Sequence, residues 1–387
     1  MKTKLKAFWP IILLSLVPTF LIWLPFFLRL ETFWTIPLPQ NGMATIVANY
    51  DGPLYLVIAK TFYNKALITA NYAFSLPVEY YAAHLPLFPL LIAIFSPIFG
   101  YPYAMLGITL ASSILALYFF QKLALQFVKK KEDALWLTFV FSILPARWLI
   151  VRSVGSAEPL FVAAIIASIY YFREKKYWYA GIWGAVAQLI KSPGILLFVA
   201  YAFAIIAPHI NKLATTGSKK WSKILNLKKL YPLALIPISL LGVFIYYQFA
   251  FGDFWAYFNS GDNIHLFFPP FQIFNYSAPW VGTFWLEEII FVYLIGLMGL
   301  IKLFKQKTGV LAWFAGIFFA SILFVSHRDI IRYSLPVIPF LIIAFSKTIV
   351  KKEFKIVMIV LAIPIYLFSL AYISQNVMQI SDWAPFL

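Results

Sequence analysis

MKTKLKAFWPIILLSLVPTFLIWLPFFL, residues 1–28, begins with lysines and continues as one long apolar run. The run is longer than the apolar core of a secretory signal peptide, and no small-residue cleavage site follows it, so it predicts a retained membrane helix. Over the whole chain, 63% of the residues are hydrophobic and 12% are charged, whereas soluble domains carry about 25% charged residues. This composition is that of an integral membrane protein.

Apolar stretches of similar kind recur to the C-terminus and predict an all-α polytopic membrane protein with about eleven transmembrane helices. The predicted spans lie near residues 8–29, 102–121, 134–151, 157–172, 178–190, 194–208, 231–250, 285–304, 310–326, 331–347 and 354–373. Several are shorter than the roughly 20 residues that a perpendicular helix needs, so we expect them to pack inside the bundle or where the bilayer thins. We see no separate soluble domain, and residues 1–387 are expected to form a single membrane domain.

The positions of the charges predict the orientation of the helices. Most Lys and Arg residues stand in short segments between apolar runs, namely 2–6, 122–131, 173–176, 212–229, 302–307 and 347–355. Because basic residues gather on the cytoplasmic side, the N-terminus is predicted inside and the C-terminus outside. The outer face then holds a long first loop, 30–101, and a second loop, 251–284. Residues 85–99 are apolar but short and interrupted by proline, which favours an interfacial or re-entrant helix in the first loop.

Net charge and cysteine content exclude some functions. The net charge of +17 follows the pattern of cytoplasmic loops, so membrane lipids and not nucleic acid are the expected partners. The basic run 211–229 either lies against anionic lipid or binds phosphate. The chain has no cysteine, which excludes disulfides, thiolate metal sites and thiol nucleophiles.

The segment NYDGPLYLVIAK, residues 49–60, places an acidic side chain, Asp51, between two apolar regions at the start of the first outer loop. A carboxylate at an apolar interface costs free energy unless it is paired or used. Gly52 permits a close approach, and Pro53 suits the first position of a helix. Asp51 is therefore either an ordinary helix N-cap or a functional carboxylate.

Five segments predicted to lie on the outer face carry a family resemblance. In order they are NYDGPLYLVIAK (49–60), EYYAAHLPLFPLL (79–91), RSVGSAEPLF (152–161), QLIKSPGILL (188–197) and HRDIIRYSLPVIPF (327–340). This ordered set resembles the bacterial and archaeal relatives of the PIG-V-type mannosyltransferases, which belong to the GT-C class of polytopic glycosyltransferases. The matching positions are Asp51, Gly52, Tyr55, Ile58, Ala59, Pro86 to Leu91, Ser156 to Phe161, Ser192, Gly194, Arg332, Tyr333, Pro336 and Pro339. Tyr50, Ala157 and Lys191 depart from the family's pattern.

The resemblance implies a GT-C bundle that transfers a sugar, mannose by the family's example, from a polyprenyl-phosphate donor to a hydroxyl acceptor outside the cytoplasm. The acceptor would be a glycan or glycolipid of the cell envelope, and the protein would be located in the cell membrane. Such chemistry needs one general base, and an aspartate at a desolvated interface suits that role. We expect Asp51 to take the hydroxyl proton and the sugar to be transferred with inversion. A second carboxylate, as glycosidases use, is not required because phosphate leaves without protonation.

The leaving phosphate predicts cationic side chains at the site. Arg332, Arg328 and Lys191 are the candidates, and the forked guanidinium of Arg332 suits phosphate best; the alternative for each is snorkelling to lipid headgroups. Glu158 either contacts substrate or is a first-turn acid favoured by the helix dipole. His84 either contacts substrate or is an ordinary polar residue of the interface. Tyr55 and Tyr333 are added as substrate-binding residues because they lie within the matching segments.

The residues predict no metal site. Asp253, Asp262 and His265 lack a ligand spacing that we recognise, although the family resemblance leaves room for a divalent cation near Asp51. Three other functions stay open: a transporter or flippase of lipid-linked sugars, a non-catalytic scaffold, and a GT-C enzyme of another family that acts on protein or lipid A. A transporter is expected to carry ionisable residues at mid-bilayer depth on several helices, whereas this chain keeps them near helix ends.

Overall fold

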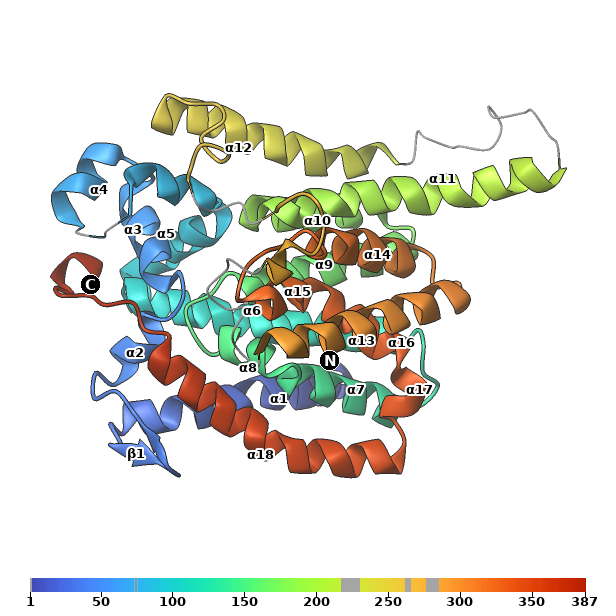
Figure 1. Ribbon diagram of the computed structural model, residues 1–387, viewed down its shortest axis with the longest axis horizontal. Coiled ribbons are helices and arrows are strands. Elements are labelled where there is room, and N and C mark those ends of the chain that lie inside the picture. The colour runs from blue at the N-terminus through green and yellow to red at the C-terminus, as the bar shows by residue number, and fades with distance from the viewer. Residues whose placement is uncertain (1, 73, 75, 217–229, 262–265, 276–284) are drawn as a thin grey trace. The chain divides into compact units, whose positions relative to one another are not determined.

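The computed structural model describes residues 2–72, 74, 76–216, 230–261, 266–275 and 285–387 (Figure 1). It is almost entirely helical, as predicted, with a single two-stranded hairpin among these residues. The chain divides into two compact units. Unit 1 comprises 1–163, 242–263 and 346–387, and unit 2 comprises 164–241 and 264–345.

Unit 1 contains the first long loop between two membrane helices. Its elements are α1 (Lys2–Phe27), β1 (Thr32–Phe33), β2 (Ile36–Pro37), α2 (Met43–Val47), α3 (Gly52–Thr61), α4 (Lys65–Asn71), the 3₁₀ helix η1 (Val78–Ala83), α5 (Leu87–Phe99), α6 (Tyr101–Ala124), α7 (Lys131–Ile143), α8 (Ala146–Val151), α17 (Ser346–Ile349), α18 (Lys352–Gln375) and η7 (Ala384–Phe386). Helices α9 (Glu158–Arg173) and α12 (Leu235–Phe251) contribute to both units.

Unit 2 holds the remaining elements, all of them helical. They are α10 (Tyr177–Ile190), η2 (Ser192–Ile195), α11 (Leu196–Thr216), η4 (Tyr231–Ala234), η5 (Gln272–Phe274), α13 (Trp285–Lys305), α14 (Val310–Ile322), α15 (Ile330–Ser334), η6 (Leu335–Val337) and α16 (Ile338–Ala344). Within this unit α11 packs on α14, and α13 packs on α14 and α16.

The predicted spans agree with most helices of the structure. In the described part of the chain, four helical segments are long and apolar enough to cross a membrane, namely Phe8–Phe27, Tyr101–Ala124, Tyr231–Phe251 and Lys352–Gln375. Four further apolar helical segments are shorter, as several of the predicted spans are, namely Leu87–Phe99, Ser192–Pro208, Val310–Ile322 and Ile330–Ala344. Helix α5 has 13 residues, a length of about 20 Å, and it packs on α3 and α6. It is too short to cross a bilayer core of about 30 Å.

Two predicted spans were wrong as single helices. The span 134–151 is divided into α7 and α8 by Leu144 and Pro145, because proline lacks the amide N–H and disfavours a helical residue before it. The span 331–347 is divided into α15, η6, α16 and the start of α17. Pro336 and Pro339 lie at the starts of η6 and α16, where a missing N–H is tolerated.

In unit 1, helix α18 has basic residues near its N-terminal end and the residues before Asp51 near its C-terminal end. At one end of α18, Lys355 Nζ lies 5.5 Å from the centre of the Trp136 ring, and Trp136 Nε1 donates to the Ile349 carbonyl over 2.8 Å. At the other end, the carbonyl of Ile373 accepts a hydrogen bond from Asn49, two residues before Asp51. Residues 355 and 373 are about 27 Å apart along the helix, close to the thickness of a bilayer core.

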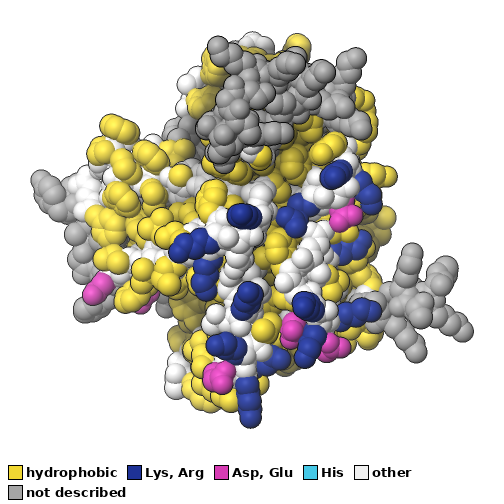
Figure 2. Space-filling view, turned by 90° about the vertical axis from the view of Figure 1, so that its right-hand side faces the viewer, with side chains coloured by type: hydrophobic (Ala, Val, Ile, Leu, Met, Phe, Trp, Pro, Cys, Tyr) yellow, Lys and Arg dark blue, Asp and Glu magenta, His cyan; other side chains and the backbone are white. Residues whose placement is uncertain are grey.

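Basic side chains are prominent on one face of the molecule. Figure 2 shows one face of the molecule on which Lys and Arg side chains outnumber Asp and Glu side chains. Basic residues accumulate on the cytoplasmic side of membrane proteins, and the assignment of this face to that side stays a prediction.

Candidate active site

Asp51 lies at the start of α3, immediately after a strained residue. Tyr50 has a φ of 50°, in the left-handed region that a bulky residue rarely adopts. The Asp51 side chain makes no N-capping hydrogen bond to the helix, so the ordinary capping role is not the one it has here. Its carboxylate is 27% exposed, and it can therefore be reached from outside the protein.

A close approach of two backbone segments places the turn before α9 next to this helix start. A Cβ atom at Gly52 would lie 2.4 Å from the Val47 carbonyl oxygen and 3.3 Å from that of Gly155. The Met105 Sδ and Cε atoms fill the space where a Gly155 side chain would be, since a Cβ atom there would lie 2.7 Å and 2.2 Å from them. The glycines thus bring the 155–158 turn to the α3 start.

Glu158 begins α9 and is almost fully buried, with 3% exposure. The Ser156 hydroxyl donates to its carboxylate. Thr109 Oγ1 in turn donates to the Ser156 carbonyl over 3.1 Å and accepts from the Ser156 amide over 3.2 Å. A carboxylate in this first-turn position is favoured by the helix dipole. The structure therefore gives Glu158 a local structural role and places its turn close to Asp51.

His84 is an ionisable neighbour of Asp51. Its Nε2 atom lies 3.9 Å from Asp51 Oδ1, and its side chain is 7% exposed. The distance is too long for a direct hydrogen bond. Two hydroxyls hold the His84 backbone, because Tyr63 Oη donates to its carbonyl over 2.6 Å and Tyr247 Oη approaches the same oxygen at 3.4 Å.

Tyr55 is buried and supports the His84 ring. The ring centres of Tyr55 and His84 are 5.1 Å apart in an edge-to-face arrangement, and Phe88 contacts the other side of Tyr55 at 4.9 Å. Such aromatic pairs restrict ring orientation. Of the predicted site residues, the structure therefore brings together Asp51, His84 and Tyr55, with the turn that carries Glu158 beside them.

The other four predicted site residues belong to unit 2; they are Lys191, Arg328, Arg332 and Tyr333. Lys191 ends α10 and is half-buried. Arg328 is exposed, while Arg332 and Tyr333 on α15 are half-buried. The Arg332 amide donates to the Asp329 carbonyl over 2.8 Å, and the ring of Tyr333 lies 5.4 Å from that of His327. Within unit 2, Arg328 thus lies two residues before α15, on which Arg332 and Tyr333 lie.

Arg147 contacts Tyr50, the residue before Asp51, and the sequence did not predict this contact. Arg147 Nη1 donates to the Tyr50 hydroxyl over 3.0 Å. The guanidinium carbon also lies 3.7 Å from the centre of the Tyr372 ring, a cation–π contact. The one signal available in the sequence was a basic residue shortly after the span-breaking Pro145, and nothing in that signal pointed to Tyr50.

Arg152 was predicted at an outer turn, and the structure places it deeper. Its guanidinium donates to the carbonyls of Ser142 and Leu14 and to both the carbonyl and hydroxyl of Ser15. Ser15 lies well inside the Phe8–Phe27 span. One ionisable residue is thus away from the helix ends, and its bonds to backbone carbonyls indicate a structural role.

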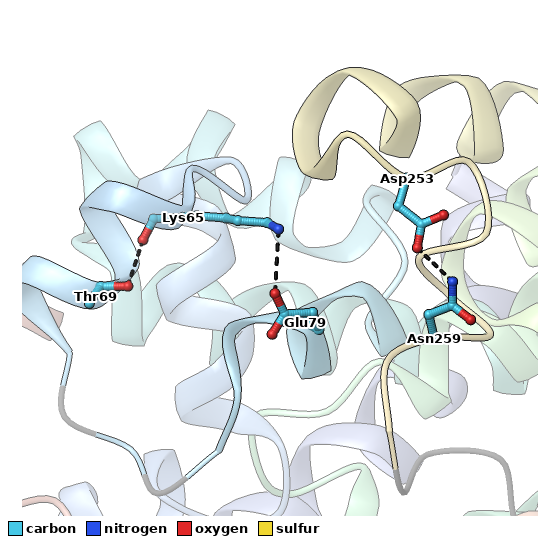
Figure 3. Close-up of polar contacts among 5 residues, drawn as sticks. All are labelled: Lys65, Thr69, Glu79, Asp253 and Asn259. Atoms are coloured by element: carbon cyan, nitrogen blue, oxygen red, sulfur yellow. Dashed lines mark hydrogen bonds and ion pairs between the residues drawn. The ribbon is translucent and has the colours of Figure 1, made fainter.

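Figure 3 shows polar contacts in each of the two predicted outer loops. Lys65 and Glu79 form an exposed ion pair at 3.4 Å, and Asn259 Nδ2 donates to Asp253 Oδ2 over 2.7 Å. Among the described residues no group of three or more His, Cys, Asp or Glu side chains could hold a metal ion. Asp262 and His265 lie outside the described residues.

Comparison with known proteins gives a fold and no family. No protein-family model matches the sequence, and no curated protein matches it. The crystal structure of ArnT from Cupriavidus metallidurans bound to undecaprenyl phosphate matches 91% of this chain with a TM-score of 0.55 and 11% identity. A structure of the Archaeoglobus fulgidus oligosaccharyltransferase in complex with Zn and sulfate matches 96% with a TM-score of 0.49 and 15% identity.

The ArnT likeness shows that this polytopic membrane protein has the fold of the GT-C glycosyltransferases, as predicted. The chain spans 63% of the length of ArnT and 54% of that of the oligosaccharyltransferase.

Proposed function

We propose that this protein is a membrane glycosyltransferase with Asp51 as general base. In the proposed reaction a sugar, mannose by the PIG-V resemblance, moves from a polyprenyl-phosphate donor to a hydroxyl of a glycan or glycolipid on the non-cytoplasmic side. The observation that carries the proposal is the Asp51 carboxylate, which is partly exposed, does not cap its helix, and has a histidine 3.9 Å away. The fold shared with ArnT supports the class.

The bond changes follow from this placement. The acceptor hydroxyl gives its proton to Asp51 as its oxygen forms a bond to the anomeric carbon. The bond between that carbon and the phosphate oxygen breaks on the opposite face, and the polyprenyl phosphate leaves with the electron pair. Attack opposite the leaving group inverts the anomeric configuration. The gap of 3.9 Å between Asp51 Oδ1 and His84 Nε2 would admit a hydroxyl oxygen about 2.8 Å from each.

The negative charge that develops on the leaving phosphate calls for cationic groups. We assign this role to Arg332, with Tyr333, Arg328 and Lys191 as further contacts of the donor. Two facts support this assignment: Arg332 is half-buried, and a guanidinium binds phosphate through paired hydrogen bonds. No step requires a metal ion, although a divalent cation bound with the donor phosphate would be compatible with this chemistry.

A transfer assay tests the proposal. Purified protein is incubated with a short-chain polyprenyl-phosphate mannose, labelled in the sugar, and with a membrane lipid extract as acceptor. Asp51→Asn keeps the side-chain volume but removes the base, so we expect about a hundredfold or greater loss of turnover with donor binding nearly unchanged. Asp253→Asn is the matched control, because Asp253 accepts hydrogen bonds from the Trp255 amide and from Asn259 Nδ2 within its own loop.

The results separate the open functions. Near wild-type turnover of Asp51→Asn would show that another group is the base. Absence of transfer from mannose, glucose and other prenyl-phosphate donors, with donor binding intact, would favour a flippase, which proteoliposomes would reveal as movement of unchanged donor. Absence of both binding and transfer would favour a scaffold.

A further inference from the structure

The C-terminal end of α18 is joined to the residues immediately before Asp51. Asn49 is fully buried, and its Nδ2 atom donates to the Ile373 carbonyl over 2.8 Å. Asn376 Nδ2 donates to Asn49 Oδ1 over 3.1 Å. The side chain of Asn49 is thus held from both its donor and its acceptor atom by residues more than 320 positions away.

Backbone bonds reinforce this connection. The amide of Met378 donates to the Ala48 carbonyl over 2.8 Å, and Asn49 forms an antiparallel β-bridge with Val377. The Asn49 carbonyl accepts the amide of Gly52 over 3.1 Å, which closes the turn around Asp51. The tail after α18 therefore pairs with the chain directly before this turn.

A second connection reaches Tyr50, the residue between Asn49 and Asp51. The Arg147 guanidinium donates to the Tyr50 hydroxyl and stacks on the Tyr372 ring of α18. The Tyr50 and Tyr372 rings are themselves 5.8 Å apart. Arg147 is 8% exposed, so the contact is shielded from water and stronger than it would be at an exposed position.

The tail continues along the other side of α3. Lys60 Nζ donates to the Pro385 carbonyl over 2.8 Å, and the Tyr72 hydroxyl donates to the same oxygen over 3.0 Å. The Phe386 ring packs edge-on against Tyr72 at 5.2 Å. The segment that follows α18 therefore contacts both the chain directly before α3 and Lys60 near the end of α3.

We propose that the end of α18 and the tail 376–387 form a clamp that sets the position of the Asp51 carboxylate, with Asn49, Asn376 and Arg147 as positioning residues. This inference rests on the proposed function of Asp51 as general base. The Asn49 carbonyl accepts the Gly52 amide and so closes the turn that contains Asp51. The backbone of residues 48–50 therefore sets the point from which the Asp51 side chain extends, and the clamp holds that backbone. Displacement of a reacting group by about 1 Å can lower a rate about a hundredfold.

Two variants of Asn376 test the clamp through turnover. Asn376→Ala removes the hydrogen bond, and Asn376→Asp keeps the shape but loses the N–H donor. We expect each variant to lower kcat about ten- to a hundredfold. KM for the donor should stay within about twofold, because Asn376 contacts Asn49, which positions the base, and does not contact the donor. The double variant Asn49→Ala/Asn376→Ala should be no worse than Asn49→Ala alone, because both remove one interaction.

Asn259→Ala is the matched control, since it removes an outer-loop asparagine whose side chain donates a hydrogen bond to Asp253. Its kcat should equal that of the wild type. An unchanged kcat in Asn376→Asp would overturn the clamp. Multiplicative losses in the double variant, or equal losses in Asn259→Ala, would also overturn it, because they indicate independent or general destabilisation.

A second readout does not depend on transfer. The chain has no cysteine, so Asp51→Cys introduces one thiol whose rate of reaction with a maleimide reports exposure at this position. Loss of one buried hydrogen bond should raise local opening, and hence labelling, about fivefold when Asn376→Ala is added. If the wild type transfers no sugar, the proposed function fails, and labelling alone decides the clamp; an unchanged labelling rate would refute it.

Discussion

Substitution of Gly52 by alanine should damage both stability and turnover, and the structure gives the size of the effect. The added Cβ atom would lie 2.4 Å from the Val47 carbonyl oxygen, whereas ordinary contact begins at 3.4 Å. Val47 and Gly155 both oppose it with backbone oxygens, which cannot turn aside as a side chain can. The backbone must therefore move by about 1 Å, and overpacking of this kind costs about 1–3 kcal/mol.

That movement falls on the residue next to Asp51. A shift of about 1 Å in a catalytic group lowers kcat by about a hundredfold, so Gly52→Ala should be nearly inactive even where the folded protein is recovered. The measurements are thermal unfolding in detergent and the transfer rate of the folded fraction. Gly155→Ala should be milder, because its Cβ atom meets the flexible side chain of Met105, which can move.

Gly107→Ala is the control for the substitution itself. Gly107 lies within α6, and a Cβ atom there meets nothing within 4 Å. Removal of a glycine from a helix interior should stabilise the protein by about 0.5–1 kcal/mol. Wild-type stability and turnover in Gly52→Ala would refute the tight approach at the α3 start, and with it the account of how the 155–158 turn is placed.

Three further outcomes are expected. Arg332→Ala should weaken donor binding and turnover together, and a change in only one of them in binding and kinetic assays would contradict the donor-phosphate role. Arg152→Lys should lower the free energy of unfolding by about 1–3 kcal/mol, because an ammonium group cannot donate to the carbonyls of Leu14, Ser15 and Ser142 in the way the guanidinium does. The control Arg328→Lys, at an exposed position, should show no such loss in thermal unfolding. Burial raises the pKa of the Tyr63 and Tyr81 hydroxyls above the ordinary 10.0. The folded protein then holds these protons more tightly than the unfolded chain, so stability is complete below about pH 10 and falls at higher pH; Tyr81→Phe should reduce that fall in alkaline unfolding curves.

Much of the helical framework could be predicted from local pattern. The predicted spans 8–29 and 354–373 overlap most of α1 and α18, because a bilayer core requires a minimum apolar length whatever the neighbours are. The incorrectly predicted helices are those in which proline interrupts an apolar run, as at Pro145. Hydrophobicity alone does not show that proline lacks the N–H that a continuous helix needs. The helix start at Gly52–Pro53 was also readable, because glycine and proline have strong local preferences.

The site was predictable only in part. Asp51 stood out as a carboxylate in an apolar setting, and the order of motifs suggested its partners. The sequence could not show that Tyr55 is buried against Phe88, nor that Glu158 is held by Ser156. A first-turn acid and a functional acid have the same local pattern, and only the surrounding contacts distinguish them.

The sequence by itself determined that this is a polytopic helical membrane protein, where most of its helices lie and where its basic loops fall, because these depend on composition and spacing along the chain. Only the tertiary structure decided that His84 lies 3.9 Å from Asp51, that Arg147 bridges Tyr50 and Tyr372, and that Asn376 reaches Asn49 across 327 positions. Such contacts arise from the packing of helices that are distant in sequence, and no local periodicity or residue preference encodes which side chains will meet.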